Sequence, residues 1–458
     1  MSDAIAHSML AGILTALDLP DGTASRVAFS SDDRLPSCFP VSELAVASIG
    51  AAAAAVSELV GLCSTVPPVS VSYRSASLWF AWSIRPQGWE MPNPWDAIAG
   101  DYKARDGWIK LHTNAPHHRA AALSVLGCEP RREVVADIVA TWRAGELEDA
   151  IVAAGGCAAR LRSVEEWAAH PQGEAVSAEP LIIWDTPNKG MASGWQPSRA
   201  RPLSGLRVLD LTRVLAGPVA TRFLAGFGAD VLRIDPPGWD EPGVIPEVTL
   251  GKRCARLDLK TPSGRNAFSE LLNKADILVH GYRSDALEEI GLGAAARQVV
   301  RPGLIDISLN AYGHSGPWAR RRGFDSLVQL SSGIAATGMD WRSADAPVSL
   351  PVQALDHATG YLLAAAAVRG VIAKTAGSGP ISARLSLART AKLLVDHKGS
   401  PSNARFVPLM DEDFGTTFEQ TDWGPARRLL SPVNIAGTPM TWTGPATKLG
   451  SSEAVWIG

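Results

Sequence analysis

Cysteine, long uncharged apolar runs and excess charge are all scarce in this chain of 458 residues. The five cysteines are scattered and none forms a Cys-X-X-Cys pair, which argues against a zinc site and a disulfide framework. The most apolar run, rich in alanine, covers 14 residues between Glu43 and Glu58, short of the roughly 20 that a membrane-spanning helix needs. The N-terminus lacks the basic flank and compact apolar core of a signal peptide. We therefore expect no metal, no membrane partner and a cytoplasmic location.

Basic and acidic side chains almost cancel, since 43 Lys and Arg face 46 Asp and Glu and give a net charge of −3. A charge this small creates no global field that would attract nucleic acid or an anionic membrane. We expect no nucleic-acid partner, and any bound anion must be held by a local group of side chains.

Apolar strand patterns alternate with helical patterns in the middle of the chain. LRVLDL at 206–211 predicts a strand, a helix follows Gly217, and DVLRIDPP predicts the next strand. Thr261 and Pro262 are typical of the first turn of another helix. This alternation predicts a parallel sheet covered on both faces, with ligands beyond the carboxyl ends of its strands. The first turn reads LAGPVA without the GxGxxG pattern, which argues against NAD.

Two alanine-rich segments resemble each other across the chain. PVSELAVASIGAAAAAVSEL begins at Pro40 and PVQALDHATGYLLAAAAVRG begins at Pro351. The segments VSVSYRSA and ISARLSLA follow them at similar distances. Two matches almost in register indicate a degenerate internal duplication. In this alignment Asp356 faces Ala45, so the first copy is expected to lack the acid.

Four blocks of the chain carry a resemblance to a known family: GLRVLDLTRVLAGPVATRFLAGFGADVLRIDPPG, GKRCARLDLKTPSGR, KADILVHGYRSDALEEIGLG and AYGHSGPWARRRGFDSLVQLSSG. They resemble, in order and spacing, the signature blocks of the class III CoA-transferase (CaiB/BaiF) family. That family also includes formyl-CoA transferases, carnitine CoA-transferases and 2-methylacyl-CoA racemases. The resemblance extends from Pro202 to about Ala388. DGWIKL and EEWAAHPQG resemble the family's smaller second domain, which normally follows the sheet domain, so the domain order is rearranged here.

The resemblance implies an α/β fold, with a parallel-sheet, Rossmann-like CoA-binding domain and a smaller α+β lid domain. We expect four segments: a degenerate helical half-repeat at 1–66, the lid-like domain and a linker at 67–200, the CoA-binding domain at 201–350, and the catalytic helix with an extended tail at 351–458. The resemblance also implies a homodimer.

Asp356 matches the family's catalytic aspartate, in the block PVQALDHATG. An Asp with an unperturbed pKa near 4 is ionised at neutral pH, and we expect this carboxylate to attack a thioester without a base. The resemblance implies a CoA-transferase that uses an acyl-CoA and a small carboxylic acid, through a mixed anhydride and an aspartyl-CoA thioester. Coenzyme A is then substrate or carrier, and no cofactor is bound permanently.

Other site residues are also implied by the resemblance. Asp325 would orient groups near the nucleophile. The expected CoA contacts are Val214 and Ala216 on the adenine side, Leu257 and Lys260 at the nucleotide, and Tyr282, Arg283 and Arg322 at the ring or phosphates. The chain departs from the family at Gly281 and Tyr282, where an asparagine and an aromatic residue are common, and at Glu289, where a basic residue is common.

Alternatives remain open at this point. A racemase needs a second base opposite the aspartate, and Phe324 stands where the family's racemases carry histidine. Intramolecular CoA transfer or isomerisation on the same site is a further alternative. A non-catalytic CoA-binding subunit is another. We expect a polar turn rather than a metal site from four scattered histidines, His112, His117, His118 and His170, and a packed or surface side chain at His357.

Overall fold

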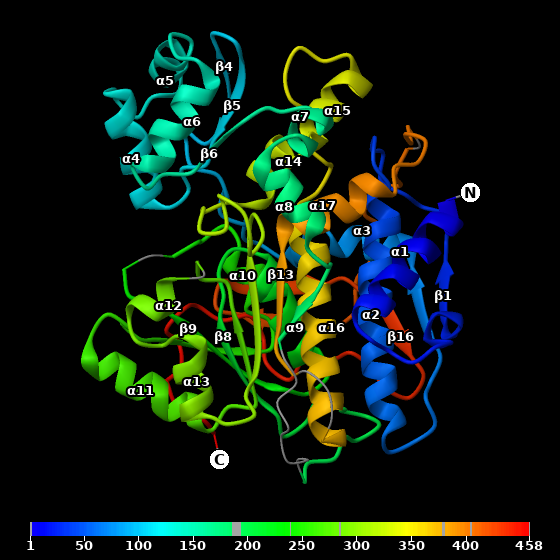
Figure 1. The fold of residues 1–458 in the computed structure, drawn as a ribbon. Helices are drawn as coiled ribbons and strands as arrows, with labels where there is room; N and C mark the ends of the chain where they lie inside the picture. The colour runs from blue at the N-terminus through cyan, green and yellow to red at the C-terminus, as the bar shows by residue number, and fades with distance from the viewer. Residues whose placement is uncertain are drawn as a thin grey trace.

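The computed structural model describes residues 2–185, 194–238, 240–283, 285–377, 381–403 and 405–457. Part of the linker expected before residue 200 lies outside these ranges. Figure 1 shows a large sheet with helices on its faces, two long helices side by side, and a smaller body of helices and short strands at one end.

The large sheet has seven strands. In spatial order they are β10 (Lys252–Arg256), β9 (Asp230–Asp235), β8 (Arg207–Leu211), β11 (Ile277–His280), β12 (Ile305–Asn310), β13 (Ala383–Ser386) and β7 (Ile183–Trp184). All neighbours pair in parallel except β7, which is antiparallel to β13. Numbered along the chain, the six parallel strands have the order 3-2-1-4-5-6, which is the Rossmann arrangement. The expected α/β fold with a Rossmann-like sheet is confirmed.

Strands buried on both faces explain the apolar runs of the sequence. All four residues of β11 are buried, as are the last four of β8. The helices of this region are α9 (Ala216–Gly226), α10 (Ile245–Val248), α11 (Pro262–Asn273), α12 (Ala286–Glu289), α13 (Ala294–Val300), α14 (Asp325–Ser331), α15 (Ile334–Arg342), α16 (Ala354–Ala376) and α17 (Leu387–Asp396). Helix α11 starts where the sequence predicts, because the Thr261 hydroxyl accepts a hydrogen bond from the backbone N–H of Gly264 at 3.1 Å.

Residues before 90 and residues near the C-terminus fold together. Helix α1 (Ser2–Ala16), the 3-10 turn η1 (Thr23–Arg26), α2 (Val41–Gly61) and α3 (Tyr73–Trp79) lie beside a sheet of β1 (Val27–Ser30), β2 (Val69–Ser72) and β16 (Val433–Ile435). Helix α2 is long and apolar enough to cross a membrane, but 89% of its most apolar window is buried inside the protein. It packs along α16 (Figure 1), as a core helix does.

A small α+β body stands at one end of the large sheet (Figure 1). Its antiparallel strands are β4 (Gly100–Ala104), β5 (Gly107–Leu111) and β6 (Ala158–Arg160), and its helices are α4 (Pro116–Leu126), α5 (Arg132–Val139) and α6 (Ala144–Ala153). It has its own apolar cluster around Ile109 and Leu147. Helices α7 (Val164–Ala168) and α8 (Pro171–Ala178) lead back to the large sheet. That sheet takes β7 and β13 from outside the segment 201–350, so its strands cross the expected segment boundaries.

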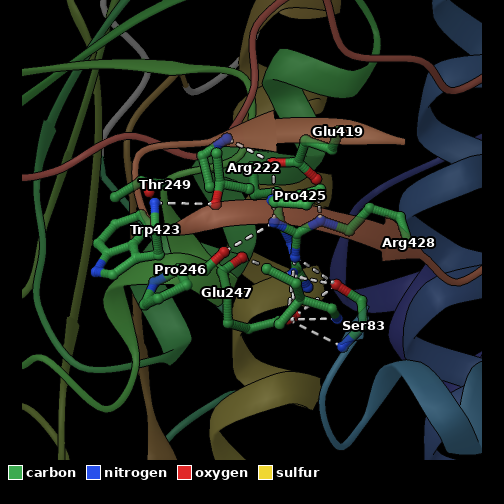
Figure 2. A network of polar contacts seen from close by, with 12 residues as sticks. Ser83, Arg222, Pro246, Glu247, Thr249, Glu419, Trp423, Pro425 and Arg428 are labelled. Carbon is green, nitrogen blue, oxygen red and sulfur yellow. Dashed lines mark hydrogen bonds and ion pairs between the residues drawn. The ribbon is translucent and has the colours of Figure 1, made fainter. Parts of the chain in front are cut away.

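The C-terminal tail is bound to the rest of the molecule by a buried ionic network, shown in Figure 2. The tail contributes the turn η2 (Asp411–Asp413) and the strands β14 (Glu419–Thr421) and β15 (Gly424–Arg428). Strand β15 lies between β14 and β3 (Ile84–Pro86) and pairs with both. The fully buried Glu247 carboxylate accepts hydrogen bonds from the backbone N–H and hydroxyl of Ser83, at 2.9 and 2.7 Å, and pairs with Arg222 and Arg428. The network therefore joins an N-terminal loop, the sheet region and the tail.

The duplication is visible in the structure, in a register that differs from the sequence alignment. Helices α2 and α16 begin after Pro40 (φ −76°, ψ 66°) and Gln353 (φ −75°, ψ 64°). Matching these first turns places Glu43, and not Ala45, opposite Asp356. The first copy therefore retains an acid, contrary to the expectation from sequence. Alanine-rich helices match each other in several registers, which explains the error.

The strand and helix that follow repeat the same design. The Ser72 hydroxyl accepts from the N–H of Ser75 at 3.3 Å at the start of α3, and Ser386 accepts from the N–H of Arg389 at 3.2 Å at the start of α17. Each copy thus consists of a long helix, a short strand and a helix capped by serine.

Candidate functional site

A cavity of about 340 Å³ lies at the carboxyl ends of β8, β11 and β12. Strand order reverses between β8 and β11, which is where a Rossmann-type sheet binds its ligand. Its lining includes Thr212, Arg213, Val214, Ala216, Gly281, Tyr282, Arg283, Asn310, Arg320, Arg321, Arg322, His117, His118 and Asp356. The sheet loops, helix α4 of the small body and the first turn of α16 therefore enclose one space.

Most of the site residues expected from sequence meet in this cavity. Those that line it are Asp356, Val214, Ala216, Tyr282, Arg283 and Arg322. Leu257 and Lys260 are absent from the described lining. Leu257 packs against the apolar cluster of the sheet, whereas the charge of Lys260 contributes to lowering the pKa of His117. Lys260 therefore lies within electrostatic reach of the cavity wall.

Asp356 lies in the first turn of α16 and is 7% exposed. Among the described residues, no group donates a hydrogen bond to its carboxylate. Its backbone N–H donates to Asp325 Oδ2 at 2.9 Å. Asp325 begins α14 and is held in turn by the side-chain amide of Gln329, whose oxygen accepts from the N–H of Leu350 at 2.7 Å. Asp325 thus fixes the helix start that carries Asp356 and leaves the Asp356 carboxylate unpaired.

The environment changes the acidity of both carboxyl groups. Burial raises the pKa of Asp356 well above its ordinary value, with further contributions from the negative charges of Asp325 and Glu241. Burial also raises the pKa of Asp325, to about 6. The expectation that Asp356 keeps an ordinary pKa near 4 is therefore wrong, because it assumed a hydrated carboxyl group. Loss of water and proximity of like charges both favour the protonated form.

Close backbone packing brings α16 to the loop after β8. A Cβ atom on Gly360 would lie 2.5 Å from the carbonyl oxygen of Ala216, so only glycine allows this approach. Val214 has a positive φ of 61°, an unusual conformation for a β-branched residue. Its N–H donates to the Glu241 carboxylate at 2.9 Å. The loop is thus held in a strained form directly beside the nucleophile candidate.

Arginines supply the positive charge of the cavity. Sequence reasoning singled out Arg283 and Arg322 but missed Arg213, which follows β8 directly and could have been found from that position. The Arg322 guanidinium donates to the carbonyl of Gly155 at 3.0 Å, and Arg321 pairs with Glu148 at 2.7 Å. The run 320–322 therefore also attaches the small body to the sheet region.

Histidines around the cavity are packed rather than clustered as ligands. His112 stacks on Phe324 with ring centroids 3.7 Å apart, and burial lowers its pKa to about 3. His357 stacks on Phe80 at 5.3 Å and is buried, as expected of a packed side chain. Over the described ranges of the chain, no group of three or more His, Cys, Asp or Glu could hold a metal ion.

Comparisons with known proteins match part of this chain, mainly the region of the large sheet, to one family. Residues 203–398 match the family model described as CoA-transferase family III. A probable fatty acyl-CoA transferase of Mycobacterium tuberculosis is 33% identical over 187 residues, which cover 38% of this chain and 47% of the relative. The succinyl-CoA:glutarate CoA-transferase of Mus musculus is 34% identical over 214 residues, covering 42% of this chain and 48% of the relative. The chain thus spans about half the length of the curated relatives it matches.

A solved structure of a hypothetical protein from Mycobacterium tuberculosis is 29% identical, covers 43% of this chain and 58% of that protein, and has a TM-score of 0.40.

Proposed function

We propose that this chain, whose residues 203–398 match the family model described as CoA-transferase family III, moves coenzyme A between an acyl-CoA and a carboxylic acid through covalent intermediates on Asp356. The observation that carries the proposal is the Asp356 carboxylate itself. It lies at the Rossmann switch-point cavity, and among the described residues no donor or cation pairs with it. A buried carboxylate that stabilised the fold would have such a partner.

The proposed reaction needs two anhydrides and one enzyme thioester. The Asp356 carboxylate attacks the thioester carbonyl, the C–S bond breaks, and CoA leaves as thiolate from a mixed anhydride. The thiolate then attacks the aspartyl carbonyl and releases the donor acid, which leaves an aspartyl-CoA thioester. The acceptor carboxylate attacks this thioester and again expels the thiolate. Attack of the thiolate on the acyl carbonyl of the new anhydride gives the new acyl-CoA and restores Asp356.

Burial raises the pKa of Asp356, but it also favours the Asp356 carboxylate as a nucleophile. A carboxylate without a hydration shell or a donor attacks a carbonyl without first losing solvent. Ala216, the first residue of α9, also lines the cavity, and we propose that free N–H groups of this helix start stabilise the oxyanion formed during attack. The small body closes the cavity from the other side through His117 and His118. This covering body would protect an anhydride from water.

The cavity arginines and Tyr282 are proposed to hold the anionic, aromatic part of coenzyme A. Arg213, Arg283 and Arg322 provide charge for phosphates, and Tyr282 provides a ring face. No cofactor is needed beyond the CoA that the substrate carries. We further propose a cytoplasmic homodimer, which light scattering would check and a purely monomeric species would contradict.

Proton exchange at the α-carbon of an acyl-CoA is a second candidate, which His118 favours. Phe324 removes the expected second base, yet His118 lines the same cavity, and neither of its ring nitrogens has a hydrogen-bond partner within the described residues. Burial lowers its pKa to about 3, so it accepts a proton poorly at neutral pH. Incubation of 2-methylacyl-CoA with the protein in D₂O, followed by mass spectrometry, distinguishes this candidate: deuterium at the α-carbon would support it.

Intact-mass measurement tests the transfer proposal directly. Incubation with a panel of acyl-CoAs should add a mass equal to CoA minus water, and hydroxylamine should remove it. The Asp356→Ala variant should show no adduct while it still binds CoA. A CoA-sized adduct that persists in Asp356→Ala, or tight CoA binding without any adduct in the wild type, would contradict the proposal.

A further inference from the structure

A second cavity, of about 350 Å³, lies on the other side of Asp356. Asp356, Val214 and Phe324 line both this cavity and the one at the strand ends. The nucleophile candidate therefore stands where two spaces meet. If CoA occupies the cavity at the strand ends, the acyl group joined to its sulfur extends past Asp356 into the second cavity. A volume above 300 Å³ is in the range of cavities that bind small organic molecules.

The walls of the second cavity are mainly apolar and aromatic. The side chains that matter most are Phe80, Trp82, Trp95, Val244, Val352 and His357. Two of them, Trp82 and Trp95, are 38% and 44% exposed. Large indole rings left partly in water beside a reactive carboxylate provide apolar surface that a bound ligand would cover.

Positive charge is missing from this space. Within the described part of the chain, no Lys or Arg lines the second cavity. Its charged side chains are Asp325 and Asp356, and an adjoining cavity that shares Trp95 and Val244 with it contains Glu241. A second carboxylate carried on the acyl group would meet these acids without a cation to pair with.

The aromatic wall is held firmly in place. Trp82 is followed by Ser83, which is bonded to Glu247 in the network of Figure 2, and Val244 lies directly before helix α10, which contains Glu247. Phe80 is fully buried and stacks on both His357 and Tyr361. The shape of the cavity is therefore preformed, which favours ligands that fit it over ligands that must rearrange it.

We infer that this second cavity binds the acyl group, and that it selects apolar monocarboxylic acids, aliphatic or aromatic, over dicarboxylic acids of the same length. The inference rests on the proposed transfer function and names its substrate class. The selecting side chains Phe80, Trp82 and Trp95 lie outside residues 203–398, the part that matches the family model. The acids named for relatives therefore do not carry over to this chain.

A matched pair of donors with six carbons tests the selection. Hexanoyl-CoA and adipoyl-CoA differ only by the terminal carboxylate, and the rate of CoA-adduct formation on the protein is measured for each. Hexanoyl-CoA should react at least about 10-fold faster, because the adipoyl carboxylate would be buried without a partner. Equal rates for the two donors would overturn the inference.

Two substitutions at the mouth of the cavity sharpen the test. Trp82→Ala should lower kcat/KM for hexanoyl-CoA by about 10-fold and change that for acetyl-CoA by less than about 2-fold. Trp95→Arg should raise the adipoyl-CoA rate relative to that of hexanoyl-CoA. Trp89→Ala is the control, because Trp89 stacks on Trp423 and lines neither cavity. An equal loss for acetyl-CoA and hexanoyl-CoA in Trp82→Ala would contradict the assignment.

The failure of the inference and the failure of the proposed function give different results. If no donor forms an adduct with wild-type protein, the transfer function itself is wrong. If both donors form the hydroxylamine-sensitive adduct at equal rates, transfer stands and only the substrate class is wrong.

Discussion

The two copies of the duplicated unit place a carboxyl group at the same point and surround it differently. Glu43 in α2 and Asp356 in α16 are both buried in the first helical turn, 6% and 7% exposed. Glu43 accepts a hydrogen bond from Arg34 Nε at 3.0 Å, and Arg34 lies over the Tyr73 ring and pairs with Asp3. Asp356 has no such cation among the described residues and faces two cavities. A buried acid at a helix start is therefore structural in one copy and available for chemistry in the other.

The strands that follow the two long helices show why the second copy lies beside the cavity at the strand ends. Strand β13 of the second copy joins the Rossmann sheet beside β12, whose carboxyl end contributes Asn310 to the cavity. Strand β2 of the first copy lies between β1 and β16 in a three-stranded sheet. That sheet has one parallel pair, β1 with β2, and its other pair, β2 with β16, is antiparallel. Within the described residues it therefore lacks the reversal of strand order that forms a switch point, and none lies near Glu43. The first copy instead supplies α2 as the packing partner of α16.

Exchanging each acid for its amide is the strongest test of this comparison. Asp356→Asn should lower CoA transfer by at least about 10³-fold, since the amide cannot form the anhydride. Glu43→Gln should retain transfer within about 2-fold. Both rates are measured with the same acyl-CoA and acid, with circular dichroism as the check on folding. A similar loss in the two variants would show that the copies do not differ in the way proposed.

Removing the cation of the first copy is expected to affect stability rather than chemistry. Arg34→Ala leaves Glu43 buried without its partner, and breaking such a pair lowers the free energy of unfolding by about 3 kcal/mol. Adding Glu43→Gln to this variant should restore part of the loss, because the amide needs no counter-charge. Urea unfolding curves measure both effects. An Arg34→Ala protein as stable as the wild type would contradict a structural role for the pair.

The transfer activity of Arg34→Ala, per folded molecule, complements the unfolding curves. It should be unchanged in Arg34→Ala, because Arg34 lines neither cavity beside Asp356. A fall in activity at full folding would show that the first copy influences the site.

Local signals in the sequence predicted the sheet and most of the site. The run at 206–211 became β8, Thr261 caps α11, and six of the expected site residues line one cavity, because each depends on its immediate neighbours in the chain. The family blocks identified Asp356 as the candidate nucleophile. The alignment register of the two copies was not predicted correctly, because alanine-rich helices match each other in several registers.

Tertiary contacts decided the features that the sequence did not predict. The bond from the Asp356 N–H to Asp325 joins residues 31 positions apart. The raised pKa values depend on burial, and burial depends on how α4, α14 and α16 assemble around the cavity. Likewise, the ring of His118 reaches the site from a separate body, 5.9 Å from the Phe324 ring.

Asp325 is the next position at which the comparison can be tested. Asp325→Asn should lower kcat by about 10-fold with little change in the KM for acyl-CoA, because the helix start that carries Asp356 loses a charged acceptor. Single-turnover adduct formation reports on the same step. The pH at which activity rises should also fall, since one of the two like charges beside Asp356 is gone. A change in KM alone would instead assign Asp325 to binding.

The smallest expected effect is a difference in how the folding stability of the protein depends on pH. The pKa of Asp325 is about 6 in the folded protein, above its ordinary value of 3.8. The folded state therefore holds a proton that the unfolded state releases between these values. This contribution to stability is full below about pH 4 and is lost as the pH rises through about 6. Burial raises the pKa of Glu43 also, but the nearby Arg34 opposes the shift.

Melting temperatures at pH 5 and pH 8 measure this difference. Wild-type protein should lose more stability across that interval than Asp356→Asn, by about 2 °C, because the variant lacks the Asp356 carboxyl group, whose own pKa is raised by burial and by the charge of Asp325. Glu43→Gln should alter the difference in melting temperature between pH 5 and pH 8 by less than Asp356→Asn does. The partner of Glu43 is a cation, which already stabilises the charged form of this carboxyl group. If the two variants altered this temperature difference equally, both acids would have to be paired in the folded protein. The physical distinction between the two copies would then be wrong.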